Sequence, residues 1–264
     1  MDTQGAEMTK IHIDDNIVFY CGDCLKVMPI LADEGVKVDL VLCDPPYGTT
    51  HCRWDSVIAF APMWDCVASV TQDSTPVLLF GQQPFTSTLG CSNLKNLRYS
   101  WVWEKNQSTG FLNAKRMPMK AHEDILVFYR KLPGYYPIKT DGHRRVVSTA
   151  YQKSVCQTGD IYQDYRNFQD YDSTERYPRS VIKFKSDKQL SSLHSTQKPV
   201  PLLEYLIRTY TQEGDTVLDF AMGSGSTAVA CRNTNRRCVG IEIDRGIFEV
   251  AVERLRTSLD EKRK

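Results

Sequence analysis

The chain has 264 residues, a formal net charge of +1 at pH 7 and the apolar and charged content of an ordinary globular protein. Its length suits one large domain, or one domain with a small insert. The near-neutral charge means that any nucleic-acid binding has to come from a local basic surface. No apolar run approaches the roughly 20 residues that span a bilayer, which argues against a membrane protein. Nine scattered cysteines and a polar N-terminus predict free thiols in the cytoplasm.

The first half of the chain alternates short apolar runs with segments of helical periodicity. Residues 38–43 are nearly all apolar, as in a parallel strand that is buried on both faces. Two prolines end this run, because proline fits neither a helix interior nor a strand ladder. The polar residues 104–122 are predicted to form a surface loop. The other predicted strands are 17–20, 76–81, 97–103 and 124–129, and the predicted helices are 25–31, 60–70 and 86–94.

A change of character separates residues 131–192 from the rest of the chain. Apolar periodicity is lost there, while tyrosines and basic residues accumulate. This composition favours an inserted binding region, with a solvated surface insert as the alternative. Residues 11–130 and 193–264 are predicted to form the two halves of one α/β domain, with a mostly parallel sheet and helices on both faces. In the second half the predicted strands are 216–220 and 237–244, and the predicted helices are 202–210, 227–232 and 247–259.

A glycine-rich turn joins a predicted strand to a helix N-terminus at residues 219–227. Gly223 and Gly225 would let a ligand approach the backbone, and the free N–H groups of the helix favour electronegative atoms. No lysine follows these glycines, so the turn is not a phosphate-binding Walker loop. Glu242 ends the next strand 19 residues after Gly223, a spacing that suits a ribose diol. Together they predict an adenosine-type cofactor without phosphates, such as S-adenosylmethionine. The alternative is a tight helix entry beside a solvated strand end.

Asp44-Pro45-Pro46-Tyr47 follows the apolar run 38–43. Ligands of open parallel sheets bind beyond the carboxyl ends of the strands, so Asp44 and Gly223 are expected at one edge. The Asp44 carboxylate and the Pro45 carbonyl offer two acceptors for an amine on a planar substrate, and Tyr47 offers a ring for stacking. A free aspartic acid has a pKa of about 4, so Asp44 is expected to accept hydrogen bonds rather than act as a general base. The alternative is a rigid turn capped by Asp44.

These motifs resemble the β arrangement of the DNA amino-methyltransferases, in which the catalytic motif precedes the cofactor motif. The resemblance covers nearly all of the chain from Gly22. Gly22-Asp23 is similar to the Gly-Asp at the cofactor adenine, and 194–199 resembles the His-Pro-Thr-Gln-Lys-Pro motif at the methionine end of the cofactor. Residues 240–244 resemble the ribose-binding strand. There are two departures, since Phe220 and Ala221 stand where the family has Pro-Phe, and Ser195 replaces a proline.

The resemblance implies a Rossmann-like methyltransferase fold with circularly permuted motif order. Its sheet would have seven mostly parallel strands and a terminal antiparallel hairpin, which residues 97–105 and 122–130 resemble. The implied activity is methyl transfer from S-adenosylmethionine to the N6 amine of an adenine flipped out of double-stranded DNA. Residues 131–192 would be the target-recognition region. A bacterial or phage enzyme of the restriction–modification type is expected, with a homodimer as a candidate assembly.

Other activities remain open at this point. Asp-Pro-Pro-Tyr is more typical of N6-adenine than of N4-cytosine enzymes, but it does not exclude N4-cytosine methylation. More distant alternatives are methylation of RNA or of protein glutamine, and a non-catalytic nucleic-acid-binding protein with the same fold. C5-cytosine chemistry is not expected, because no Pro-Cys nucleophile is present.

The expected site residues fall into three sets, of which Asp44, Pro45, Pro46 and Tyr47 form the catalytic set, and no metal ligand is among them. Cys21 and Cys24 have the spacing of a metal-ligand pair, but no second pair accompanies them. Candidate contacts to DNA are Lys105, Arg116, Arg144, Arg145 and Arg179. The residues expected at the cofactor are Asp23, Cys24, Thr196, Gln197, Lys198, Asp219, Ala221, Gly223, Ser224, Gly225, Ser226, Thr227, Glu242 and Ile243.

Overall fold

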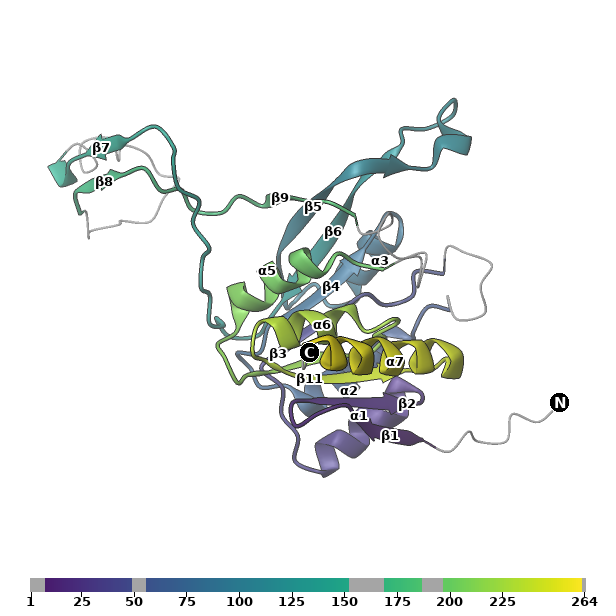
Figure 1. Cartoon of the computed structure of the whole chain (residues 1–264). Coiled ribbons are helices and arrows are strands. Elements are labelled where there is room, and N and C mark those ends of the chain that lie inside the picture. The colour runs from purple at the N-terminus through teal and green to yellow at the C-terminus, as the bar shows by residue number, and fades with distance from the viewer. Residues whose placement is uncertain (1–7, 49–55, 152–168, 187–196, 263–264) are drawn as a thin grey trace. The chain divides into compact units, whose positions relative to one another are not determined.

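The computed structural model describes residues 8–48, 56–151, 169–186 and 197–262, with side chains up to residue 257. Its main sheet is built from β1 (Thr9–His12), β2 (Ile17–Cys21), β3 (Leu40–Cys43), β4 (Val77–Gly81), β5 (Leu97–Thr109), β6 (Lys120–Phe128), β9 (Val181–Phe184), β10 (Thr216–Asp219) and β11 (Arg237–Glu242). Within the described residues, the order across the sheet is β1-β2-β11-β10-β3-β4-β6-β5-β9 (Figure 1).

Five neighbouring strands at the centre of this sheet run parallel: β2, β11, β10, β3 and β4. Their residues are almost all buried, because helices cover both faces, and this explains the continuous apolar runs in the sequence. Parallel strands place their carboxyl ends at one edge of the sheet. The segments that follow these five strands therefore meet at that edge, although they are widely separated in the chain.

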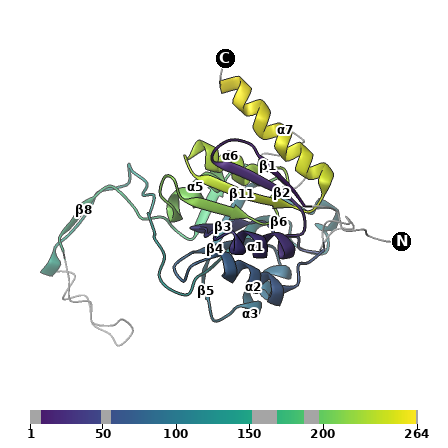
Figure 2. The same ribbon diagram turned by 90° about the horizontal axis from the view of Figure 1, so that it is seen from below.

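Two groups of helices cover the faces of the sheet (Figure 2). A core cluster that includes Val27, Val67 and Leu89 lies on the face of the first group, and a cluster that includes Leu206 and Phe248 lies on the face of the second. The first group is α1 (Cys24–Asp33), α2 (Phe60–Val70) and α3 (Phe85–Ser92), and the second is α5 (Val200–Tyr210), α6 (Ser226–Asn233) and α7 (Arg245–Lys262).

The antiparallel part of the sheet matches the predicted terminal hairpin. β6 pairs antiparallel with β4 on one side and with β5 on the other. The seven strands from β2 to β5 across the sheet agree with the predicted methyltransferase sheet, while β1 and β9 extend it at the two edges. β9 lies within the stretch 131–192 that was predicted as an insert, yet it pairs parallel with β5.

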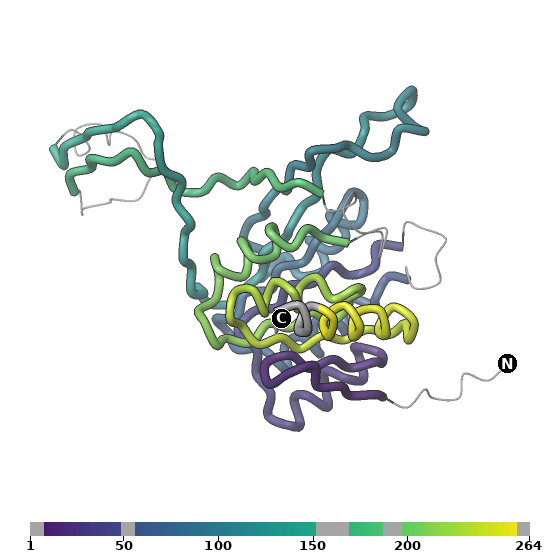
Figure 3. The backbone as a smooth tube through the Cα atoms, viewed as in Figure 1, coloured from purple at the N-terminus to yellow at the C-terminus, as the bar shows by residue number. Residues whose placement is uncertain are grey.

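The predicted surface loop 104–122 is wrong in its extent. β5 continues to Thr109 and β6 begins at Lys120, so most of this segment forms a long hairpin that projects beyond the rest of the sheet (Figure 3). Glu104 pairs with His122, and Thr109 pairs with Lys120. Backbone hydrogen bonds sustain an antiparallel ladder where the side chains are polar, so the loss of apolar residues did not mark the end of the strands. The hairpin ends in a short 3-10 turn, η1 (Phe111–Asn113).

The chain divides into a main unit, Met1–Tyr136 with Ser180–Lys264, and a small unit, Pro137–Arg179. The small unit contains a two-stranded antiparallel sheet formed by β7 (Val146–Ser148) and β8 (Tyr171–Ser173). Arg145, which immediately precedes β7, forms an ion pair with Asp172 of β8. In the parts of the chain that the structure describes, no helix is both long and apolar enough to cross a bilayer.

Candidate active site

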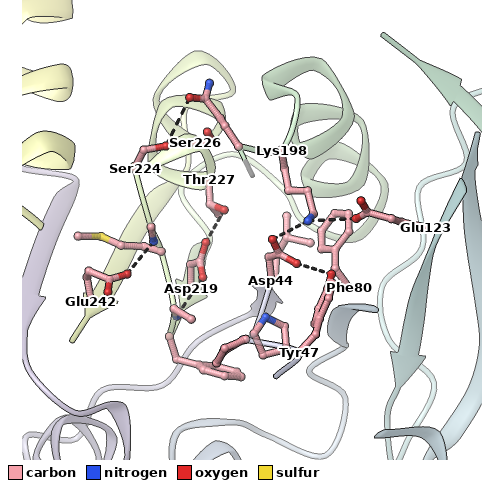
Figure 4. Close-up of a pocket in the computed structure, with 18 of the residues that line it drawn as sticks. Asp44, Tyr47, Phe80, Glu123, Lys198, Asp219, Ser224, Ser226, Thr227 and Glu242 are labelled. Carbon is pink, nitrogen blue, oxygen red and sulfur yellow. Dashed lines mark hydrogen bonds and ion pairs between the residues drawn. The ribbon is translucent and has the colours of Figure 1, made fainter. Parts of the chain in front are cut away.

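A pocket of about 490 Å³ opens at the carboxyl ends of the parallel strands (Figure 4). All of its lining residues belong to the main unit. The turn after β3 contributes one side of the pocket, and the turn after β10 contributes the other. Acidic and amide side chains that line the pocket at the ends of the five parallel strands, or within two residues after them, are Asp23, Asp44, Gln82, Asp219 and Glu242.

The Asp44 side chain is held from within its own turn. Tyr47 donates a hydrogen bond from its hydroxyl to Asp44 Oδ1, at 2.5 Å. The ring of Tyr47 stacks on Phe85 of α3, with 5.0 Å between the ring centroids and 29° between the planes. The turn is thereby fixed at both the hydroxyl and the ring of Tyr47, and the second carboxylate oxygen of Asp44 faces the pocket residues described next.

Lys198 brings an ammonium group to this second oxygen. Its Nζ lies 2.5 Å from Asp44 Oδ2 and 3.0 Å from Glu123 Oε2, and its side chain is only 9% exposed. The ammonium also lies over the ring of Phe80, 5.1 Å from the centroid. Lys198 was predicted at the cofactor; it lines the pocket, and its charged end lies on Asp44.

Glu123 extends the charged cluster onto the hairpin strands. It forms an ion pair with Lys105, and Gln82 Nε2 donates a 3.1 Å hydrogen bond to Glu123 Oε1. Lys105 was predicted to contact DNA from a surface loop, but its side chain is 8% exposed and lines the pocket. We define Asp44, Lys198, Glu123 and Lys105 as the charged cluster.

Glu123 is not among the residues predicted from the sequence, although the alternation along β6 could have identified it. Glu123, Ile125 and Val127 alternate along β6 and are all buried. Alternate residues of a strand share a face. Because Ile125 and Val127 are apolar and face the core, Glu123, two residues earlier, is expected to point toward the core as well. An acidic residue almost never occupies such a position without a cationic partner.

The charged cluster shifts the pKa of its members. Burial and the nearby Glu123 raise the pKa of Asp44, against the opposing effect of Lys198. Burial also disfavours the ionised form of Glu123, but Lys198 and Lys105 outweigh it and lower the pKa of Glu123. Burial opposes the charge on Lys198, whereas its two carboxylate partners raise the pKa of its ammonium. Lys198 is therefore cationic at neutral pH.

The opposite side of the pocket is built by the glycine-rich turn. Asp219 Oδ2 accepts a 2.6 Å hydrogen bond from Thr227 Oγ1, and Asp219 Oδ1 accepts one of 3.2 Å from the backbone of Ala221. Burial raises the pKa of Asp219 to about 6, although the bond from Thr227 acts in the other direction. The Glu242 carboxylate accepts from the backbone N–H groups of Gly223 and Asp244, at 3.0 and 2.9 Å.

The two glycines of this turn have different surroundings. Gly223 has a φ of +52°, and a Cβ at this position would have no atom within 4 Å, so the backbone is open toward the pocket. Gly225 has a φ of +78°, and a Cβ there would lie 3.2 Å from Leu255 and 3.3 Å from Ala251. Gly225 was predicted at the cofactor, but it packs against α7 and does not line the pocket.

The remaining predicted residues are placed as follows. Asp23 caps α1 by accepting a 2.9 Å hydrogen bond from the backbone of Leu25, and it lines the pocket. Thr196 lies outside the described residues, Arg116 is exposed on the hairpin, and Arg144, Arg145 and Arg179 are exposed on the small unit. The other predicted residues that line the pocket are Cys24, Pro45, Pro46, Gln197, Ala221, Ser224, Ser226 and Ile243.

Comparison with known proteins places this chain in a family. The family model described as DNA methylase, which comprises N6 and N4 enzymes, matches residues 38–253. The chain belongs to the N6/N4 DNA methylases. This membership confirms the resemblance inferred from Asp44-Pro45-Pro46-Tyr47 and the glycine-rich turn, and it identifies the protein as a DNA methyltransferase.

Three similar proteins illustrate how far the likeness of this DNA methylase extends. The type II methyltransferase M.HpaI of Haemophilus parainfluenzae is 27% identical over 248 residues, which cover 89% of this chain and 73% of that protein. The DNA adenine methyltransferase YhdJ of Escherichia coli K12 is 25% identical over 269 residues, which cover 95% and 86%. The structure of M1.HpyAVI with SAM is 22% identical, with a TM-score of 0.61 and coverage of 90% and 99%, and supports the fold.

Among the residues that the structure describes, no group of three or more His, Cys, Asp or Glu side chains is arranged to hold a metal ion. Cys21 and Cys24 are both free thiols, buried where β2 ends and α1 begins. Burial raises the pKa of Cys24 to about 12, so this thiol is protonated at neutral pH and is a poor metal ligand.

Proposed function

We propose that this DNA methylase transfers a methyl group from S-adenosylmethionine to the N6 amine of an adenine in double-stranded DNA. The observation that carries the proposal is the ammonium of Lys198 on Asp44 Oδ2. The carboxylate after β3 thus accepts an N–H donor inside the pocket, which is the interaction that an exocyclic amine requires. Adenine is proposed as the target because Asp44-Pro45-Pro46-Tyr47 resembles the form of the motif that is more typical of N6-adenine enzymes, and YhdJ, one of the similar proteins, is a DNA adenine methyltransferase.

The charge of the pocket supports a cationic cofactor without phosphates. Among its described lining residues, five are acidic and two are basic. Such a surplus of carboxylates attracts a sulfonium and repels phosphate groups. Gly223 leaves room for close approach to the backbone, and the buried Glu242 carboxylate retains lone pairs for the hydroxyls of a ribose. The residues therefore fit S-adenosylmethionine, with Glu242, Asp219 and Asp23 as the groups that would hold it.

The proposed roles in transfer follow from the geometry on the Asp44 side. S-adenosylmethionine supplies, when bound, a methyl group on a cationic sulfur. Asp44 accepts an N–H of the target amine and orients its lone pair, and Tyr47 keeps Asp44 in position through the bond to Oδ1. The target nitrogen would form its bond to the methyl carbon as the sulfur–methyl bond breaks, leaving a neutral thioether, and would then lose one proton to solvent, so no covalent enzyme intermediate is required. Positioning of the two reacting groups supplies much of the rate.

Two surfaces are proposed to contact DNA. The hairpin segment 106–122 contains three lysine or arginine residues, Lys115, Arg116 and Lys120, and no acidic one, and its tip exposes Phe111 and Leu112 at 78% and 98%. Lys105, Gln107, Ser108 and Thr109 at the base of the hairpin line the pocket, so the tip extends from the site where a flipped base would enter. Basic side chains bind phosphates, and apolar tips insert between bases.

The small unit is the second proposed DNA-contacting surface, and it would read the target sequence. Arg144, Arg145 and Arg179 are exposed on it. The Arg145 guanidinium is already paired with Asp172, so we expect Arg144 and Arg179 to contribute more to phosphate binding.

A homodimer and a cytoplasmic location are part of the same proposal. Sedimentation of the protein with and without DNA measures the oligomeric state.

Methyl transfer from tritiated S-adenosylmethionine to unmethylated DNA, followed by nucleoside analysis, tests the proposal. We expect the label in N6-methyladenine. Label in N4-methylcytosine selects the other branch of the family, and label in neither nucleoside, with intact cofactor binding and diverse DNA, contradicts the proposed function. Asp44→Ala serves as the matched inactive control, because it removes the proposed acceptor without altering the cofactor side of the pocket.

A further inference from the structure

The ammonium of Lys198 occupies the oxygen that the substrate amine needs. Asp44 Oδ1 already accepts from the hydroxyl of Tyr47, and Oδ2 lies 2.5 Å from Lys198 Nζ. Figure 4 shows the ammonium between the Asp44 and Glu123 carboxylates. An incoming amine therefore meets an acceptor that is engaged on both oxygens.

A resident cation is also unfavourable at a later stage of the reaction. The nitrogen that has received a methyl group is positively charged until it loses a proton. Like charges that share one partly buried carboxylate repel each other, because the protein around them screens charges less than bulk water does. Asp44 can serve the transfer best when the Lys198 ammonium has withdrawn from it.

Glu123 provides the place to which the ammonium can withdraw. It already lies 3.0 Å from Lys198 Nζ, on the far side from Asp44. Its own position is fixed independently by the ion pair with Lys105 and the hydrogen bond from Gln82. A small movement of the Lys198 side chain thus breaks its contact with Asp44 and keeps its contact with Glu123. The ammonium then remains buried beside the Glu123 carboxylate.

We propose that Lys198 is a positioning residue that holds Asp44 before the target amine enters and shifts onto Glu123 when it does. The proposal rests on amine methylation as the proposed function, and it applies to adenine and cytosine alike. Before the amine enters, the ammonium compensates the partly buried Asp44 carboxylate, whose side chain is 26% exposed, and afterwards the amine takes over Oδ2. Glu123 and Lys105 set how readily this exchange occurs.

The pH dependence of activity separates this role from a purely structural one. Removing the Lys198 charge takes away a group that lowers the pKa of Asp44, whereas removing the Glu123 charge takes away one that raises it. The acidic limb of kcat/KM should therefore move in opposite directions in the two variants, since this limb follows ionisation of the free enzyme. The titratable groups that face Asp44 from the elements around it are Cys43, Tyr47, Glu123, Lys198 and Asp219.

The experiment compares Lys198→Met and Glu123→Gln on unmethylated DNA between pH 5 and 9. For Lys198→Met we expect the acidic limb to move upward by roughly one pH unit and kcat at pH 7 to fall by about tenfold or more. For Glu123→Gln we expect the limb to move downward and the KM for DNA to rise several-fold with a smaller change in kcat. In this variant Lys198 has no second carboxylate and stays on Asp44. Binding of S-adenosylmethionine should be unchanged in both.

Lys105→Met is a second test of the proposal, and it leaves Lys198 and both of its carboxylate partners, Asp44 and Glu123, unchanged. Glu123 then has Lys198 as its remaining ion-pair partner in the cluster and draws the ammonium away from Asp44. We expect a lower KM for DNA and an acidic limb shifted upward, the reverse of Glu123→Gln. This variant keeps the proposal testable even if Lys198→Met or Glu123→Gln fails to fold, as judged by cofactor binding and the thermal transition.

Glu104→Gln is the matched control on the same hairpin. Glu104 is 41% exposed and pairs with Lys183 on the neighbouring strand, away from the charged cluster, so its loss should leave the pH profile and the KM unchanged. Acidic limbs that stay in place, or that move in the same direction in Lys198→Met and Glu123→Gln, overturn the proposal. Failure of the wild-type protein to methylate DNA at all would instead overturn the proposed function.

Discussion

Thr227 donates a 2.6 Å hydrogen bond to Asp219, and this bond ties the first turn of α6 to the end of β10. It also opposes the effect of burial, which raises the pKa of Asp219 to about 6. The ionised form of Asp219 is the form that attracts a cationic cofactor. The affinity for S-adenosylmethionine should therefore fall as the pH is lowered through about 6, because Asp219 then becomes protonated and neutral.

Thr227→Val tests this relationship. Loss of the hydroxyl raises the pKa of Asp219 further, so a larger fraction of Asp219 is protonated at pH 7. We expect cofactor affinity at pH 7 to fall by about tenfold, corresponding to the ~1.5 kcal/mol of a hydrogen bond to a charged group, and the pH at which affinity is lost to move upward. Calorimetric titration across pH 5–8 measures both. Thr257→Val is the control, since the Thr257 hydroxyl is exposed and bonds within α7. Equal affinity and pH dependence in Thr227→Val and wild type would contradict this account.

Asp44→Asn separates the charge of Asp44 from its shape. The amide fits the same space, but it lacks the negative charge that stabilises the methylated amine before proton loss. We expect methyl transfer to fall by at least about 100-fold, the range that follows removal of one preorganised electrostatic group, with cofactor affinity within about twofold. Label transfer and calorimetry measure the two quantities. Asp73→Asn, at an exposed ion pair with Arg130 and Lys131, is the control and should retain full activity. Normal turnover of Asp44→Asn would remove Asp44 from the mechanism.

Gly240→Ala should destabilise the protein. A Cβ at this position on β11 would lie 2.4 Å from Met222 Sδ and 2.8 Å from the ring of Phe19, both in the core. Overpacking of this kind costs about 1–3 kcal/mol, and we expect it in the free energy of unfolding measured with urea. Gly90→Ala in α3 is the matched control, because its Cβ would meet Leu97 at 3.5 Å, an ordinary contact, and alanine favours a helix. An equal stability change in both variants would show that close packing at Gly240 is not limiting.

The hairpin tip should matter for DNA and not for folding. Phe111 and Leu112 are almost fully exposed, so Phe111→Ser with Leu112→Ser removes little buried surface and should leave the melting temperature unchanged. We expect DNA affinity to fall by roughly tenfold because the apolar tip no longer packs against bases. Leu94→Ser, at another exposed leucine, is the control. DNA affinity equal to that of the wild type would exclude the tip from the interface.

The basic residues of the same tip make a separate prediction. Lys115 and Arg116 are exposed beside the apolar pair. Replacing both by alanine should weaken binding to all DNA sequences and reduce the dependence of log affinity on log salt by about one for each phosphate that is no longer neutralised. Affinity measured between about 50 and 200 mM salt tests this, and an unchanged slope would place both residues outside the interface.

Much of the fold could be predicted from the sequence, because its central strands are buried on both faces and read as unbroken apolar runs. Residues 60–70 match α2 in both bounds, and the runs at β3, β4, β10 and β11 differ from the structure only at their ends. The hairpin and β9 could not be found in this way. Their side chains are largely exposed, and the backbone ladder that holds them leaves no apolar signature.

The sequence by itself determined the family, the parallel sheet and the two turns that face each other across the pocket. These follow from local patterns: apolar runs, two prolines after one strand, and glycines after another. Only the tertiary structure decided that Lys198 and Glu123 meet at Asp44. Their contact depends on the order of the strands and on the pairing of β4 with β6. Asp44 and Lys198, for example, are 154 positions apart in the chain. No local pattern encodes such a contact, because strand order and register are settled by packing of the whole sheet.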